Sequence, residues 1–366
     1  MYFGENTRED RVWNYTIDIT NFYYMITKVR NSNFELLRIV AMFFIVTYHI
    51  IAKTTMGEYV SSPYLSMVTM PLHIGVICFL LITGYYGVEL SLKKIVNLGG
   101  VTIFYNVLVY LVYSIIVEDF SLLRFGASFF PICLNPDLWF IRTYILFLLC
   151  TPVINYWLKN TTKEIRLLTL VSLAFMSLYV GCFGNDDSFQ EGKNVVNFCF
   201  LYVVGNELHQ REFIKDFKMS SLLFSYVVLN VVVCLATYFL TNTSFFPFFK
   251  ELVWYYDSPL LILNAVLLFM VFEQIKVQSI VLNNIAKSVF PIYLIHANLY
   301  TGRVLWPYVN SYVEPEYSLS LICFIALIIM FLCIAIDKLL VLFYKRMIEL
   351  IYNKILTTRL FLKYTR

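Results

Sequence analysis

Apolar runs of about 20 residues dominate the chain, and short segments between them hold most of the charged residues. A helix needs about 20 apolar residues to cross the hydrocarbon core of a bilayer. Because backbone groups in lipid must hydrogen-bond within the protein, such runs predict membrane-spanning helices. About ten runs qualify, at 36–53, 65–87, 96–117, 138–157, 166–183, 194–209, 219–240, 259–274, 283–303 and 318–342. We therefore expect an all-α, polytopic membrane protein with about ten transmembrane helices.

The composition supports a membrane environment. Hydrophobic residues make up 60% of the 366 residues and charged residues 14%, whereas a soluble domain is nearer half apolar and a quarter charged. This excess excludes a disordered chain, a nucleic-acid-binding module and an ordinary cytosolic enzyme. The eight cysteines contain no C-x-x-C pair, so we interpret them as buried apolar residues and expect no disulfide framework and no metal site.

Lysine and arginine are concentrated in alternate segments between the runs. These segments lie around Lys93 and Lys94, at 159–166, at 211–218, at 276–287 and at 345–366. The segments between them hold acids instead, such as Glu118, Asp137 and Asp257. Cytoplasmic loops of membrane proteins carry the excess of basic residues. We therefore predict a multi-pass membrane protein with both termini in the cytoplasm.

Two terminal segments flank a membrane domain that we place at 31–345. Residues 1–30 form a tail without the apolar core of a signal peptide. Met25 is a more natural start, so residues 1–24 are either a disordered tail or the product of an upstream start codon. Residues 346–366 mix apolar and basic residues. This pattern predicts an amphipathic cytoplasmic helix on the inner leaflet, or a tail that only fixes topology.

The first span carries two ionisable residues, Arg38 and His49, with Glu35 at its inner edge. His49 follows Arg38 by eleven positions, so both project from one face of a helix and lie about 16 Å apart along its axis. Glu35 can pair with Arg38 at i, i+3. A structural ion pair and a core histidine would explain the pattern. Within lipid, however, ionisable residues usually face the bundle interior and have a function.

Polar residues of other spans are expected at the depth of His49. With alternating helix directions, several of them fall in the outer half of the bilayer and predict a polar chamber. They are His49, His73, Arg142 and His296, with Trp139 one turn from Arg142 and Tyr293 one turn from His296. Histidines also bind metals, but no Asp or Glu is expected at this depth, so we predict no metal site.

The second span ends in Thr83 and Gly84. Threonine supplies a hydroxyl group, and glycine lets another group approach the backbone closely. The pair is a candidate for substrate binding. A contact between small residues of two helices is the alternative interpretation, and it is common in membranes.

Five motifs occur in order along the chain. An Arg, ten residues and a His, from Arg38 to His49, lie in NFELLRIVAMFFIVTYH, and CFLLITGYYG follows. LWFIRTYILFLLCTPVIN leads with Trp and reaches a proline, WYYDSPLLILNAVLLFMVFE contains Ser-Pro, and SVFPIYLIHANLY contains Tyr-Leu-x-His. From about Asn31 to about Lys345 the chain thus resembles acyltransferase family 3, which includes bacterial polysaccharide O-acetyltransferases. Thr83 departs from the serine that is usual there.

The resemblance implies an O-acyltransferase that moves acetyl, or another short acyl group, from cytoplasmic acyl-CoA to a hydroxyl of a cell-surface glycan or its lipid-linked precursor. Acyl-CoA is then a co-substrate, and no cofactor is expected to stay bound. Arg38, with Lys93 or Lys94, would attract the CoA phosphates. His49 would act as a general base or form an acyl-histidine. Arg142 or Tyr293 would stabilise the oxyanion. We expect the substrate to contact Glu35, His73, Thr83, Gly84, Trp139, Tyr293 and His296.

Two other functions stay open at this point. A glycan or lipid transporter also places charged groups in mid-membrane, although neither inverted repeats nor acids at that depth are evident here. A non-catalytic membrane partner in surface-polysaccharide assembly is the third possibility. The partners that we expect are membrane lipid, acyl-CoA and a saccharide acceptor, with no nucleic acid. The sequence does not select the acceptor, the acyl group or the oligomeric state.

Overall fold

A computed structural model describes residues 32–182, 191–210, 217–314 and 316–357. This part of the chain is built from helices and contains no strand. The expected N-terminal tail, 1–30, lies outside the described residues, as do positions 358–366 of the C-terminal tail. The all-α fold class is confirmed.

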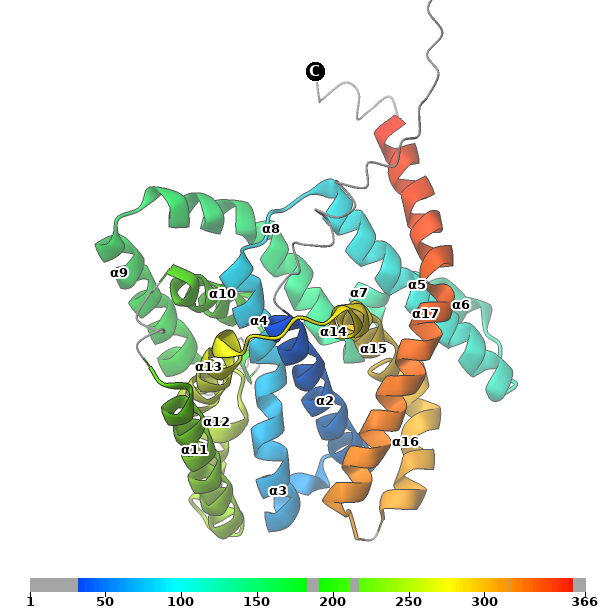
Figure 1. Cartoon of the computed structure of the whole chain (residues 1–366). Coiled ribbons are helices and arrows are strands. Elements are labelled where there is room, and N and C mark those ends of the chain that lie inside the picture. The colour runs from blue at the N-terminus through cyan, green and yellow to red at the C-terminus, as the bar shows by residue number, and fades with distance from the viewer. Residues whose placement is uncertain (1–31, 183–190, 211–216, 315, 358–366) are drawn as a thin grey trace, which may run out of the picture.

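The described helices follow one another with short connections (Figure 1). In chain order they are α2 (Asn33–Thr54), η1 (Glu58–Ser61), α3 (Pro63–Thr69), η2 (Met70–His73), α4 (Ile74–Tyr86), α5 (Leu92–Ile116), α6 (Leu122–Ser128), α7 (Pro131–Leu134), η3 (Pro136–Leu138), α8 (Trp139–Asn160), α9 (Lys163–Ala174), η4 (Phe175–Cys182), α10 (Val195–Gln210), α11 (Met219–Leu240), α12 (Phe246–Trp254), α13 (Pro259–Gln274), α14 (Ile280–Ala286), α15 (Val289–His296), α16 (Leu299–Val313) and α17 (Leu319–Thr357).

Among the described residues, eight helical stretches are long and apolar enough to cross a membrane. A ninth span is added if the bent pair Ile280–His296 and Leu299–Val313 counts as one. The expected span at 194–209 corresponds to α10, which has only 16 residues and is shorter than the length that a crossing usually needs. The structure therefore supports eight or nine candidate spans, and our count of about ten is not confirmed.

The expected span at 283–303 is broken rather than continuous. Its two helical parts meet at an angle of 84°, between His296 at the end of α15 and Leu299 at the start of α16. Asn298 causes the break, because its backbone is extended and its side chain accepts a hydrogen bond from the Tyr300 N–H (3.0 Å). Its amide also donates to Asn106 of α5 (2.9 Å). His296 therefore lies at a helix end inside the bundle.

The second expected span is interrupted too. Between α3 and α4 lies η2, a 3-10 turn that contains Pro71. Proline has no N–H to donate and clashes with the carbonyl four residues earlier, so it disturbs a regular α-helix. His73 is the last residue of this turn.

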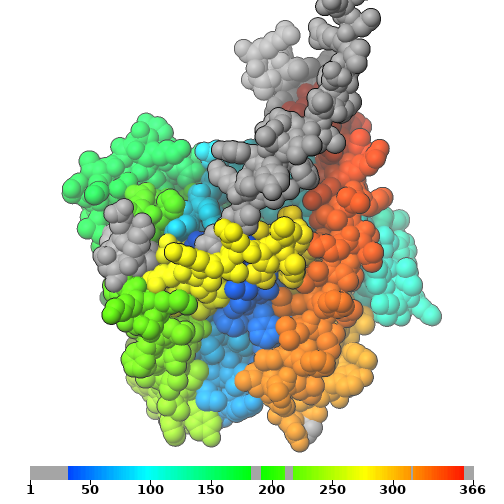
Figure 2. All heavy atoms as spheres, in the orientation of Figure 1, coloured from blue at the N-terminus to red at the C-terminus, as the bar shows by residue number. Residues whose placement is uncertain are grey.

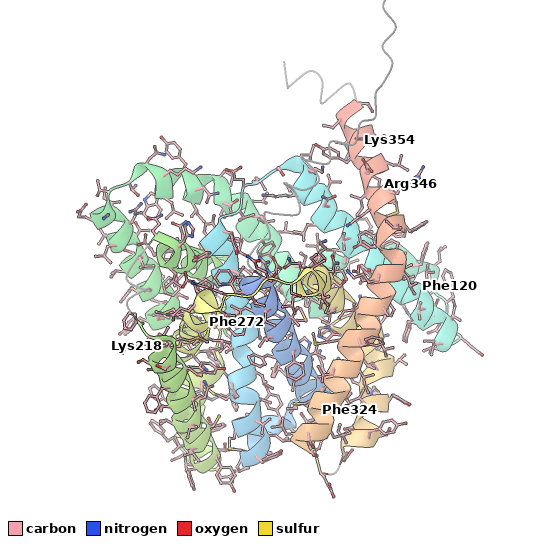
Figure 3. All side chains as sticks on the ribbon, viewed as in Figure 1. Phe120, Lys218, Phe272, Phe324, Arg346 and Lys354 are labelled. Carbon is pink, nitrogen blue, oxygen red and sulfur yellow. The ribbon has the colours of Figure 1, made fainter. Side chains whose placement is uncertain are left out.

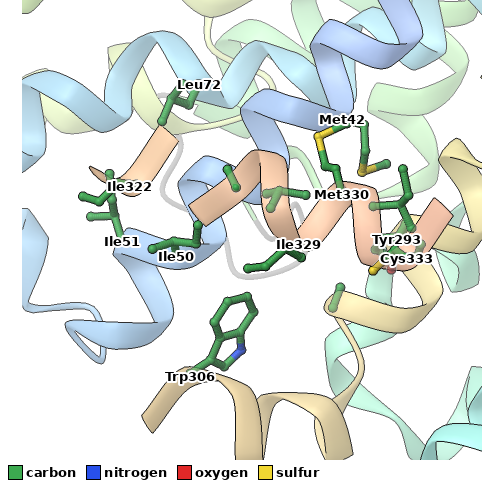
Figure 4. Close-up of a cluster of buried hydrophobic side chains, with 14 of the residues drawn as sticks. Met42, Ile50, Ile51, Leu72, Tyr293, Trp306, Ile322, Ile329, Met330 and Cys333 are labelled. Carbon is green, nitrogen blue, oxygen red and sulfur yellow. The ribbon is translucent and has the colours of Figure 1, made fainter. Parts of the chain in front are cut away.

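Helix α2 stands at the centre of the bundle and contributes to two large apolar clusters. Met42, Val46 and Ile50 pack with α15, α16 and α17, and Figure 4 shows this contact. Phe34 and Leu37 pack with α4, α10 and α13. The span that contains α4 is mostly buried, whereas α9, η4 and α11 are mostly exposed, which is expected where a helix meets lipid. Arg38 and His49, which are half-buried, therefore lie on a helix that packs within the protein.

The connection after α13 crosses the beginning of α2. In Figure 2 the yellow residues lie over the dark blue ones. The Ser32 N–H donates to Val277 O (2.7 Å), and the Asn33 amide donates to Phe272 O (2.9 Å). These bonds satisfy groups at the beginning of α2 and fix its position.

Helix α17 has 39 residues and at 1.5 Å per residue is about 58 Å long. The hydrocarbon core is about 30 Å thick, so α17 is longer than one crossing requires. Its C-terminal part projects past the neighbouring helices, where Figure 3 labels Arg346 and Lys354. Residues 346–357 of the expected amphipathic tail are thus helical, but they continue the last span instead of forming a separate helix.

Candidate functional site

His49 and His296 form a direct hydrogen bond in the middle of the bundle. The His49 Nδ1 atom lies 3.0 Å from His296 Nε2, although 247 positions separate the two residues. His296 Nδ1 lies 2.6 Å from the carbonyl oxygen of Ile292, one turn earlier on α15. A chain of contacts therefore runs from a backbone carbonyl through one imidazole to the other.

This chain assigns the tautomer of each neutral ring. A carbonyl oxygen only accepts, so His296 Nδ1 carries the hydrogen, and its Nε2 accepts. His49 Nδ1 then donates to that Nε2, and the lone pair of His49 is on its own Nε2. No described residue bonds to this Nε2 atom. Two imidazoles in series thus present one unprotonated nitrogen.

A small chamber of about 120 Å³ adjoins His49. Its lining is mostly apolar and aromatic. The side chains come from α2, η2, α4, α8, α15 and the loop that precedes α13. The lining residues are Met42, Ile45, Tyr48, His49, Leu72, His73, Val76, Phe79, Trp139, Phe140, Tyr256, Val289, Phe290 and Tyr293. The predicted residues His49, His73, Trp139 and Tyr293 therefore meet here, whereas His296 supports the chamber from behind.

His73 presents its ring to the same chamber. Its Nδ1 lies 2.9 Å from Thr69 O, so Nδ1 carries the hydrogen and Nε2 is an acceptor in the neutral ring. The ring lies against Tyr48, with 4.3 Å between the ring centroids. The chamber thus contains two imidazoles whose orientation is fixed by hydrogen bonds.

Arg38 lines a second and larger cavity, of about 670 Å³. The Arg38 Nη1 atom lies 2.7 Å from Glu35 Oε1, the i, i+3 pair that the sequence predicts. Thr83, Tyr144 and Lys287 also line this cavity. A guanidinium and an ammonium group in one cavity are suited to phosphate.

The two cavities adjoin each other. Both are lined by Phe79, Phe140, Val289 and Phe290, which we call the aromatic partition. Arg38 and His49 therefore line neighbouring cavities that share these four apolar side chains. Their axial separation of about 16 Å follows from the eleven intervening helical steps.

Arg142 does not lie in the chamber, contrary to our prediction. Phe140, Ile141 and Tyr144 are the residues of α8 that line the Arg38 cavity. At 100° per residue, Arg142 lies about 200° around the helix from Phe140. Its side chain is exposed and lines neither cavity. Trp139 lines the chamber, but Arg142 lies about 60° from it around the helix, on the side away from Phe140.

Gly84 is a helix contact and lines neither cavity. A Cβ atom there would clash with the Tyr202 carbonyl oxygen, and one at Gly205 would clash with Leu81 O. The two glycines let α4 and α10 approach closely. This supports the structural alternative for Gly84, whereas Thr83 lines the Arg38 cavity and donates to Phe79 O (2.8 Å).

Lys93 and Lys94 separate from each other. Lys93 lines a third cavity, of about 510 Å³, between α5 and α17. Lys94 is exposed outside the cavities, where its Nζ donates to Glu89 O (2.8 Å). The predicted phosphate contact at this position therefore rests on Lys93.

Several site residues were missing from the sequence analysis. Tyr48 and Tyr256 line the His49 chamber, and Tyr48 OH lies 3.0 Å from Tyr59 OH. Tyr48 lies next to His49 and Tyr256 lies in the motif that contains Ser-Pro, but neither position alone shows which neighbours share a cavity. Asp337, inside the expected span 318–342, was overlooked as well and is fully buried. In the part of the chain that the structure describes, no cluster of three His, Cys, Asp or Glu residues could hold a metal ion.

Comparison with known proteins matches most of the chain to a family model. None of the curated proteins and none of the solved structures compared with the chain matches it significantly. A family model described as an acyltransferase domain matches residues 31–338, which include every residue of the His49 chamber and the Arg38 cavity. With its multiple apolar helices, the chain belongs to acyltransferase family 3 and is a multi-pass membrane acyltransferase.

Proposed function

We propose that this acyltransferase moves a short acyl group, most often acetyl, from acyl-CoA on the cytoplasmic side to a hydroxyl group of a cell-surface glycan or its lipid-linked precursor. The observation that carries the proposal is the pair of adjoining cavities, one with the Arg38 guanidinium and the other with the unprotonated Nε2 of His49. Transfer from an anionic donor to a hydroxyl acceptor needs a cation that binds the donor and a base that activates the hydroxyl, in cavities that lie next to each other.

The donor enters through the Arg38 cavity. Arg38 and Lys287 give this cavity a positive charge that attracts the anionic donor as it enters, and the pantetheine arm passes the aromatic partition. The thioester then lies in the His49 chamber. The chamber volume of about 120 Å³ suits a short acyl group better than a fatty one.

His49 acts on the acceptor hydroxyl as a general base. Its Nε2 takes the proton while the hydroxyl oxygen attacks the thioester carbonyl carbon. The C–S bond breaks, the imidazolium returns the proton to the departing sulfur, and the products are an ester and free CoA thiol. Tyr293, which lines the chamber, takes the oxyanion-stabilising role in place of Arg142.

An acyl-histidine route uses the same atom. There the acyl group passes to His49 Nε2, CoA leaves, and the acceptor hydroxyl attacks the acyl-imidazole. Incubation with labelled acetyl-CoA and no acceptor separates the routes, because only the second one labels the protein.

Mass analysis of surface glycans tests the proposed function. Cells with the intact gene, without it, and with His49→Ala are compared. Loss of acetyl mass in both altered strains supports the proposal, since base catalysis contributes roughly 10²- to 10⁴-fold. His209→Ala is the matched control, because His209 is exposed and lines neither the His49 chamber nor the Arg38 cavity. Loss of the whole polymer in the deletion strain would instead indicate transport or assembly.

A further inference from the structure

The third cavity lies between α5, the α14–α15 connection and α17. Lys93, Lys287 and Lys345 line it from these three elements. Glu349 is the one acidic residue among the described residues of the lining, and Tyr352 adds an aromatic ring. The cavity therefore has an excess of positive charge, and we call it the basic cavity.

The lysines of the basic cavity are available to a ligand. Lys93, Lys287 and Lys345 are all exposed, and none has an ion-pair partner within the described ranges. Lys287 Nζ donates to the side chain of Asn284 (3.0 Å), which leaves further N–H donors on the ammonium group. Three separate elements thus present ammonium groups to one volume of about 510 Å³.

A buried hydrogen-bond network holds the walls of this cavity together. Asp337 of α17 accepts from Tyr105 OH of α5 (2.8 Å), from Ser288 Oγ before α15 (2.6 Å) and from Tyr344 OH (3.1 Å). Tyr344 itself lines the cavity. Because one carboxylate joins all three elements, the backbone segments that carry the lysines are held in fixed relative positions before any ligand binds.

The close approach of α5 and α17 gives the cavity a floor. A Cβ atom at Gly100 would lie 2.8 Å from Cγ1 of Ile348, so α17 can pack here only because position 100 has no side chain. Tyr344, Lys345, Ile348, Glu349, Tyr352 and Asn353 of α17 line the cavity. All of them lie beyond residue 338, where the family match ends. The cavity is therefore completed by the projecting part of α17.

The basic cavity adjoins the Arg38 cavity. Lys287 and Phe290 line both of them, and Phe290 also belongs to the aromatic partition next to the His49 chamber. The three cavities thus follow one another from His49 to the protruding end of α17. A ligand whose reactive group lies at His49 would have its far end here.

We propose that the basic cavity binds the 3′-phosphoadenosine 5′-diphosphate end of acyl-CoA, with Lys93, Lys287 and Lys345 on its phosphates and Tyr352 beside its adenine. This inference rests on the proposed function and names the donor's recognition site. Ammonium groups and phosphates form strong, charge-assisted hydrogen bonds. An anionic lipid headgroup offers the same phosphate chemistry, but it would leave the continuity with the two other cavities without a role.

The test uses the purified full chain in phosphatidylcholine nanodiscs, with glycan from a deletion strain as acceptor. The donors are acetyl-CoA, acetyl-dephospho-CoA and S-acetylpantetheine, which lacks the nucleotide. Lys93→Gln, Lys287→Gln and Lys345→Gln should each raise the KM for acetyl-CoA about tenfold, because each removes one charge-assisted contact. Turnover of S-acetylpantetheine should not change. Arg346→Gln is the control, since Arg346 is exposed beside Lys345 but does not line the cavity.

Two results would overturn the inference while leaving the proposed function intact. The first is an equal loss of turnover with S-acetylpantetheine and with acetyl-CoA in the lysine variants. The second is an unchanged KM for acetyl-CoA in all three variants. In the second case, weaker retention of phosphatidylglycerol in nanodiscs that contain it would assign the cavity to a lipid headgroup.

Direct binding of adenosine 3′,5′-bisphosphate separates this inference from the proposed function. The probe should bind the unaltered chain and lose about tenfold in affinity in each lysine variant. If no donor supports acyl transfer, the proposed function fails. The binding measurement alone then decides whether the basic cavity is a nucleotide site. Binding that depends on the lysines would support a nucleotide site, and absence of binding would exclude it.

Discussion

Replacement of His296 tests the assignment of His49 as base without altering His49 itself. In His296→Leu the acceptor of the His49 Nδ1–H, 3.0 Å away in the structure, is removed. The His49 ring can then rotate or change tautomer, and its lone pair is no longer fixed on Nε2. We therefore expect kcat to fall while the substrates still bind.

The magnitude of this fall has two bounds. The hydrogen bond itself contributes about 1 kcal/mol net, which corresponds to roughly fivefold in rate. Complete loss of the base would cost about 10²- to 10⁴-fold. Without His296, the His49 lone pair can lie on either ring nitrogen, and only the form with the lone pair on Nε2 acts as the base. We therefore expect a value between the two bounds, a fall of about 100-fold in kcat, with KM changed by less than about twofold.

Two further substitutions separate positioning from packing. In His296→Gln, the terminal amide oxygen lies as many bonds from Cβ as the histidine Nε2, so it can accept from His49. In His296→Asn it is one bond short. The kcat of His296→Gln should be about tenfold higher than that of His296→Leu, whereas the kcat of His296→Asn should stay close to that of His296→Leu. The assay measures acetyl transfer by purified protein, with equal folding verified by size-exclusion chromatography and thermal melting. Unaltered kcat in His296→Leu, or equal rates for Gln and Leu, would refute the reasoning.

Arg142→Ala should leave kcat within about twofold, since the side chain is exposed outside the chamber, and a tenfold loss would restore its oxyanion role. Val76 lines the chamber, so Val76→Ala should raise kcat/KM for propionyl-CoA relative to acetyl-CoA about tenfold. An unchanged ratio would place the acyl group elsewhere. Gly84→Ala should lower stability by about 1–3 kcal/mol in a thermal melt, because the added Cβ meets Tyr202 O. Gly99→Ala, with no atom within 4 Å of its Cβ, should be at least as stable as the unaltered chain, and equal melting of both variants would contradict the clash.

The sequence predicts the helical content well because lipid permits few alternatives to a helix. The expected spans 219–240 and 259–274 coincide with α11 and α13. Breaks inside a span are harder to predict. Apolar residues surround Pro71 and Asn298, so an average over about 20 residues does not show that the helix is interrupted there.

The candidate site is predictable only as far as it depends on one helix. The spacing of Arg38 and His49 follows from the helical repeat, and both residues line adjoining cavities. The orientation of one helix relative to another does not follow from a repeat. This explains why Arg142 was assigned to the wrong face and why the contact between His49 and His296 could not be predicted as a hydrogen bond. Asp337 could have been singled out from the sequence as an acid inside the expected span 318–342, whereas only the fold shows the three hydroxyl groups that donate to it.

The aromatic partition has a consequence for the cell's energy supply. Adjoining cavities inside a membrane protein carry the danger of an ion leak, and many membranes store energy as an electrical potential. Phe79, Phe140, Val289 and Phe290 separate the two cavities with side chains that hold no water or ion, and narrow apolar constrictions of this kind stay dry. An apolar partition of this kind therefore opposes the passage of ions between the two cavities.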